Sequence, residues 1–177
     1  MTHEPTRVRQ VVDWTAALWA GIVSGLVFLV LNLLLLPYIP GMTAPVFFRY
    51  VAAIVMGTSV LPPPSDNFTV TILVAAVFVN FALAIIFAIL LAIITHQWGL
   101  VAGILVGGAF GFAVYLINLY AVMRLFPWFF LLQNNVFAIT HVIFGAVAGA
   151  VYEMLEVEKF APINGAPSGE EMEGANV

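Results

Sequence analysis

The sequence predicts an all-α integral membrane protein with four transmembrane helices plus one short interfacial or re-entrant helix. Of its 177 residues, 63% are hydrophobic and 8% are charged, whereas a soluble domain carries roughly one charged residue in four. Between Trp14 and Tyr152 the only charged residues are Arg49, Asp66 and Arg124. Three charges cannot cover the surface of a soluble domain of this length, so we expect the chain to lie in a lipid bilayer.

Four continuous apolar segments are long enough to cross a bilayer, which takes roughly 20 helical residues. They cover about residues 15–36, 68–95, 98–123 and 136–155. Only His96 and Gln97 separate the second segment from the third, so we expect these two helices to form an antiparallel hairpin. The second helix can be capped by one of three polar residues: Ser65, Asp66 or Asn67.

A fifth apolar segment, about residues 46–61, is too short for a comfortable span. We expect it to form the interfacial or re-entrant helix; if it crossed the membrane instead, the two termini would lie on opposite sides. The domain organisation is then an N-terminal segment at 1–13, a membrane domain at 14–160 and an acidic tail at 161–177. The composition of this tail, rich in Glu, Gly, Pro and Asn, predicts disorder.

The few basic residues predict the orientation. With four spans, Arg7, Arg9 and Lys159 lie on one side of the membrane, and Arg49 and Arg124 lie on the other. Cytoplasmic loops carry the excess of Lys and Arg, so we expect both termini in the cytoplasm.

Small residues recur every four positions on three of the predicted spans. These helix-packing candidates are Gly21, Gly25, Gly103, Gly107, Gly111, Gly145 and Gly149. Lipid tails are as apolar as leucine, so membrane helices associate where small residues let their backbones approach. These faces can pack within the chain or against a partner subunit, and the sequence leaves both interpretations open.

An internal repeat is also possible. Gly21, Gly25 and Asn32 recur at a constant offset as Gly107, Gly111 and Asn118. The pattern indicates either a parallel duplication of a two-helix unit or a coincidence among abundant residue types.

Polar side chains at membrane depth are costly and often functional. Six of them form a candidate polar site in the outer half of the membrane: Asn32, Arg49, Asn80, Asn118, Arg124 and His141. One interpretation is a small site open to the outer face, with Arg49 attracting an anionic group. The alternative is that the asparagines and His141 form hydrogen bonds between helices, each worth about 0.6–2 kcal/mol.

Several functional classes find no support in the residues. The net charge of −4 and scattered basic residues argue against nucleic-acid binding, and the chain has no cysteine for disulfides or thiol chemistry. Its three histidines, His3, His96 and His141, are too far apart to share a haem or a zinc ion. No nucleophile–base pair is visible. We therefore expect no metal, no cofactor and no enzymatic activity.

One segment carries a resemblance. The residues His141-Val142-Ile143-Phe144-Gly145, followed by Gly149 and Tyr152, are similar to the last helix of the YagU-like small bacterial membrane proteins. The resemblance covers about twelve residues and the helix count. It implies about four helices in the inner (plasma) membrane of a bacterium, and it implies no mechanism.

The sequence thus favours a non-catalytic accessory or scaffolding subunit that packs against other membrane proteins, or against copies of itself, through its glycine faces. The alternative is a transporter or channel component that uses the outer polar residues to bind a small solute.

Overall fold

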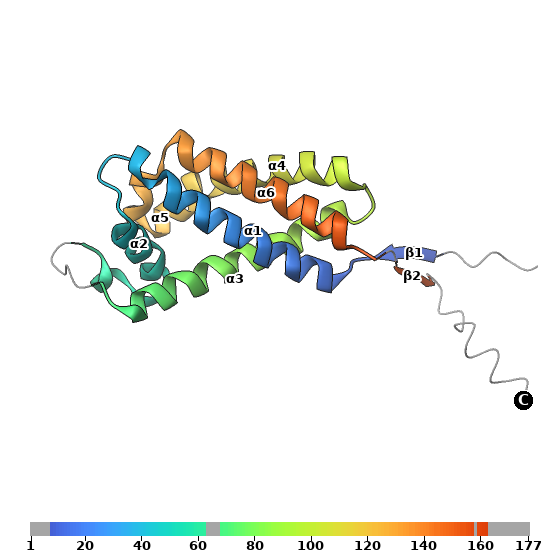
Figure 1. The fold of residues 1–177 in the computed structure, drawn as a ribbon, viewed down its shortest axis with the longest axis horizontal. Helices are drawn as coiled ribbons and strands as arrows, with labels where there is room; N and C mark the ends of the chain where they lie inside the picture. The colour runs from blue at the N-terminus through green and yellow to red at the C-terminus, as the bar shows by residue number, and fades with distance from the viewer. Residues whose placement is uncertain (1–7, 63–67, 158, 163–177) are drawn as a thin grey trace, which may run out of the picture.

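A computed structural model describes residues 8–62, 68–157 and 159–162. Four of its helices are long and apolar enough to cross a membrane, which confirms the prediction of four such helices. They form an elongated bundle (Figure 1). Their bounds are α1 (Trp14–Leu35), α3 (Val70–Thr95), α4 (Leu100–Ile117) and α6 (Asn135–Leu155).

Short helical elements gather at one end of this bundle (Figure 1). The short helix α2 (Ala44–Met56) begins after Thr43 and ends at Gly57, whose φ of 81° breaks the helix earlier than the expected residue 61. Its position at a membrane interface stays a prediction. The remaining short elements are η1 (Leu36–Tyr38), η2 (Thr58–Val60), η3 (Asn118–Val122), α5 (Met123–Leu125) and η4 (Pro127–Leu132).

Two short strands lie at the opposite end, which the all-α prediction did not include (Figure 1). Strand β1 (Val8–Val11) pairs antiparallel with β2 (Lys159–Pro162), and Val8 stands opposite Pro162. The segments before α1 and after α6 therefore leave the bundle together. The predicted disordered tail lies outside the described residues from position 163 onward.

Side-chain caps start three of the long helices. Asp13 Oδ1 accepts hydrogen bonds from the backbone N–H groups of Thr15 at 3.0 Å and Ala16 at 3.2 Å. Asn134 Oδ1 accepts from Phe137 N at 2.9 Å at the start of α6. Helix α3 is capped by Thr69, whereas the predicted caps Ser65, Asp66 and Asn67 lie outside the described residues.

Helices α4 and α6 meet backbone to backbone along their glycine faces. A Cβ atom added to Gly107 would overlap the carbonyl oxygen of Gly145, and one added to Gly111 would overlap that of His141. Gly149 lies in the same way against Gly103. These glycine faces are therefore occupied within the chain.

The second close contact joins α1 to α3. A Cβ on Gly21 would lie 2.6 Å from Ile85 Cα, and one on Gly25 would lie 2.8 Å from Ala84 Cβ. Helix α6 also packs against α1, which gives the order α4–α6–α1–α3 around the bundle. Helices α3 and α4 make few contacts with each other although they are consecutive in the chain.

Substitution of Gly107 by alanine should destabilise the bundle, because the added methyl group must push α4 away from the Gly145 carbonyl. We expect Gly107→Ala to lower the free energy of unfolding by about 1–3 kcal/mol, measured by denaturant titration in mixed micelles. The neighbouring Gly108→Ala is the control: its added Cβ would meet Val142 Cγ1 at an ordinary 3.7 Å. Better helix propensity should make that variant neutral or more stable by up to about 1 kcal/mol. Equal destabilisation by both variants would contradict the packing described.

Candidate functional site

A cavity of about 260 Å³ lies within the half of the bundle that holds α2 and η4. Its walls are almost entirely apolar. Eight of the lining side chains are Phe or Tyr: Phe28, Phe47, Phe87, Tyr115, Phe126, Phe129, Phe137 and Phe144. None of the described lining residues is Asp, Glu, Lys or Arg.

Three of the six predicted site residues line this cavity together. Asn80 comes from α3, Asn118 from the junction of α4 and η3, and His141 from α6. The structure thus brings together side chains that lie 23 to 61 positions apart in the sequence, since 141 − 118 = 23 and 141 − 80 = 61.

The ring of His141 is held in one orientation. Its Nδ1 atom lies 2.7 Å from the carbonyl oxygen of Phe137; a carbonyl only accepts, so Nδ1 carries the proton. The other ring nitrogen, Nε2, lies 3.1 Å from Asn118 Nδ2, which donates to it. The imidazole is therefore a neutral ring with both nitrogens paired. It also packs against Phe28, with the ring centroids 4.8 Å apart.

The side chains of Asn80 and Asn118 each use the amide nitrogen, but not the amide oxygen, in a hydrogen bond within the described part of the chain. Asn80 Nδ2 donates to the carbonyl oxygen of Gly25 at 3.1 Å, which ties α3 to α1, while Asn118 Nδ2 donates to His141. The side-chain oxygens of both residues accept no hydrogen bond from the described part of the chain. The cavity thus offers amide acceptors within apolar walls.

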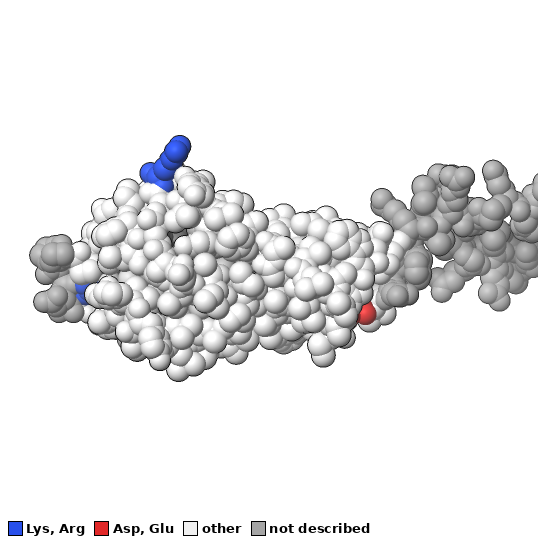
Figure 2. All heavy atoms as spheres, turned by 90° about the horizontal axis from the view of Figure 1, so that it is seen from above, with Lys and Arg blue, Asp and Glu red and all other residues white. Residues whose placement is uncertain are grey.

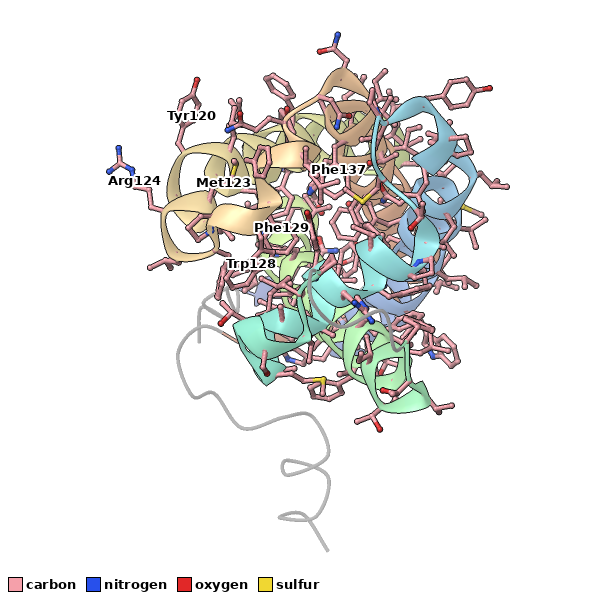
Figure 3. All side chains as sticks on the ribbon, turned by 90° about the vertical axis from the view of Figure 1, so that its left-hand side faces the viewer. Tyr120, Met123, Arg124, Trp128, Phe129 and Phe137 are labelled. Atoms are coloured by element: carbon pink, nitrogen blue, oxygen red, sulfur yellow. The ribbon has the colours of Figure 1, made fainter. Side chains whose placement is uncertain are left out.

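The other three predicted site residues do not line the cavity. Asn32 is fully buried; it donates to Phe28 O at 2.8 Å and accepts from Thr140 Oγ1 at 3.3 Å, so it links α1 to α6. Arg49 is buried on α2, and Arg124 is exposed on α5 and points away from the bundle (Figure 3). On the face that Figure 2 shows, the coloured basic atoms lie at the end of the bundle that holds these elements.

Sequence reasoning gave no role to two polar residues that the structure places in hydrogen-bond networks. Thr140 accompanies Asn32, as described above. Tyr152 is fully buried near the strands, where its hydroxyl accepts from Asp13 N at 3.3 Å and donates to Glu156 Oε1 at 3.0 Å. This network joins the start of α1 to the end of α6. The sequence signal was present, since Tyr152 belongs to the segment that carried the resemblance. Its partner Glu156 is four positions away, but its other partner, Asp13, is 139 positions away.

No known family model, curated protein or solved structure matches this chain. The resemblance to the YagU-like proteins therefore stays a prediction. Among the described residues, no three His, Asp or Glu side chains are grouped as a metal site would require. Function has to be inferred from the chemistry of the cavity.

The bond between Asn118 and His141 should be measurable as a coupling energy. We expect the double-mutant cycle of Asn118→Leu and His141→Leu, followed by unfolding in mixed micelles, to give a coupling of about 0.6–2 kcal/mol. The cycle of Asn80→Leu with His141→Leu is the control, because no hydrogen bond joins these two side chains in the described structure. A coupling as large in the control cycle would contradict a specific Asn118–His141 bond.

Proposed function

We propose that this protein is a membrane-embedded binding protein for a small, uncharged amphipathic molecule and acts as a component of a transporter. The supporting observation is the convergence of Asn80, Asn118 and His141, from three different helices, on one apolar cavity. A hydrogen bond between helices accounts for Asn32 without any ligand. It does not account for Asn80 and Asn118, which line a cavity and whose side-chain oxygens accept no hydrogen bond from the described residues.

The chemistry of the walls selects the ligand. A charged molecule would lose its hydration in this cavity without gaining an oppositely charged partner, which is strongly unfavourable. An apolar body instead fits walls made largely of phenylalanine, and a hydroxyl or amine group on it can donate to the Asn80 or Asn118 oxygen. At about 260 Å³ the cavity is slightly below the roughly 300–1,000 Å³ of pockets for drug-sized ligands, which favours a small molecule.

The glycine faces are not available as the interface that the accessory-subunit hypothesis requires. The glycine faces expected to contact other subunits are occupied by α4–α6 and α1–α3 packing, so a partner would have to bind a different face. That role, like association with copies of the same chain, stays a prediction. The proposed role is non-catalytic and requires no cofactor.

The proposal also includes a location: the inner membrane of a bacterium, with both termini in the cytoplasm. The pairing of β1 with β2 supports a common side for the two termini. The choice of the cytoplasmic side rests on Arg7 and Arg9, which precede the first span.

Two related dyes test the proposed ligand class. N-phenyl-1-naphthylamine is uncharged and has one N–H donor, whereas 8-anilinonaphthalene-1-sulfonate has the same rings and a negative charge. We expect saturable binding of the first dye and none of the second, measured in lipid nanodiscs by energy transfer from Trp128. This residue is the only tryptophan in the cavity half and packs on the cavity residue Phe129, with ring centroids 6.1 Å apart.

The same assay tests the role of the amide acceptor. The variant Asn118→Leu should bind the uncharged dye roughly 2- to 10-fold more weakly, as expected for the loss of one hydrogen bond. A dye methylated at its nitrogen has no donor and should bind this variant and the wild type equally. Absence of saturable binding, or equal binding of the sulfonate, would refute the proposed function.

A further inference from the structure

The cavity is partly open to the outside of the bundle. On one side the close contacts of α4 with α6 and of α1 with α3 leave no passage. At the level of the cavity, Gly111 lies on the backbone of the lining residue His141, and the lining residue Asn80 donates to the carbonyl oxygen of Gly25 at 3.1 Å. Helix α6 packs along α1 between these two contacts. The row α4–α6–α1–α3 is therefore a continuous wall.

The end that faces the predicted outer surface is covered as well. Trp128 Nε1 in η4 donates to the carbonyl oxygen of Tyr50 in α2 at 3.0 Å, and the rings of Tyr50 and Phe129 make an edge-to-face contact at 6.3 Å. Seen from this end, Trp128 and Phe129 lie between α2 and the α5–η4 segment (Figure 3). These two contacts form a roof that joins α2 to η4 over the outer end of the cavity.

The opposite end of the cavity is closed by an aromatic pair. Phe87 of α3, a lining residue, meets Phe110 of α4 with ring centroids 6.3 Å apart. Beyond this pair the two helices converge on the short turn at Thr95–Leu100. The seam between α3 and α4 is thus joined below the cavity.

The remaining side is the seam between α3 and α4 at the level of the cavity itself. Lining residues of α3, such as Asn80 and Leu83, face Val114 and Asn118 across it, and the two helices make few contacts. Leu83 is 41% exposed; it is the single described lining residue that is exposed, so it marks the mouth of the cavity.

We infer that the ligand enters and leaves through this seam, sideways from the bilayer, and is therefore a lipid-dissolved molecule and not a solute of the outer water. This inference rests on the proposed function and narrows its ligand class. The long faces of a membrane-spanning bundle are surrounded by lipid tails, so a lateral mouth exposes the cavity to the hydrocarbon. The ligand is an uncharged hydrophobic compound with one hydroxyl or amine donor. The expected opening to the outer face is replaced by a lateral one.

A size series at the mouth tests the route. The exchange of N-phenyl-1-naphthylamine is followed in nanodiscs by stopped-flow energy transfer from Trp128. We expect Leu83→Phe to slow both association and dissociation several-fold and Leu83→Ala to accelerate both, because a barrier at the mouth affects the two directions alike. The matched controls are Leu90→Phe and Leu90→Ala. Leu90 is an exposed leucine of the same helix outside the cavity lining, and its variants should leave both rates unchanged.

A roof variant distinguishes the alternative route. Tyr50→Leu removes the edge-to-face contact with Phe129 and should leave the exchange rates close to those of the wild type. Faster exchange in this variant, with no effect of Leu83, would overturn the inference in favour of an opening to water. A change in the dissociation rate alone in the Leu83 variants would also overturn it, since Leu83 would then be only a contact residue.

If the wild type shows no saturable dye binding, the proposed function itself fails. Normal binding with unaltered rates in all Leu83 variants rejects only the lateral route.

Discussion

The backbone contact between α4 and α6 is the interaction on which the rest of this bundle depends. In lipid, the burial of leucine contributes little free energy to helix association, and helices associate through close backbone packing and hydrogen bonds. Gly111 lies directly against the carbonyl of His141, and Asn118 stands two helical turns further along α4, about 10 Å away. The close approach of the two backbones brings the Asn118 amide within reach of the imidazole ring. The packing and the polar pair are therefore one arrangement.

The same contact explains why a cavity forms where it does. Glycine occupies the face of α4 that meets α6, whereas the side towards α3 carries Phe110, which meets Phe87 of that helix. Helix α3 in turn uses Ala84 to approach α1. The small residues of α4 thus pack against α6, and the small residue of α3 packs against α1. Bulky side chains remain between α3 and α4 and keep these two helices apart. The wider turn of the π-helix at Asn118–Val122 then supplies three lining residues, Asn118, Leu119 and Val122. Such π-helical turns frequently occur at functional sites.

The sequence was sufficient to predict the four long helices and the depth of their residues in the membrane. It was not sufficient to predict how each helix is rotated about its own axis. Apolar run lengths predicted the four long helices, and counting along them placed Asn80, Asn118 and His141 in the same half of the bundle. Rotation is harder to predict, because a helix that is apolar on every side has no polar face to indicate which way it turns. For this reason the predicted polar site included Asn32, which faces Thr140 in the structure. It also included Arg124, which points outward. The β1–β2 pair joins segments about 150 positions apart, and a local sequence pattern does not predict a contact between segments so far apart.

The contrast between the two halves of the bundle bears on whether the cavity is functional. Near the strands the helices touch at backbone distance, and Tyr152 is fully buried with its hydroxyl paired. A chain able to pack so closely at one end leaves about 260 Å³ unfilled at the other, where the lining atoms lose the dispersion contacts that a filled core would provide. Both ring nitrogens of His141 are paired within the chain, so the imidazole needs no ligand as a hydrogen-bond partner. The Asn80 and Asn118 oxygens, by contrast, accept no hydrogen bond from the described residues, and the proposed ligand would supply the donor. The lost packing contacts and the two amide acceptors therefore both support the proposed ligand.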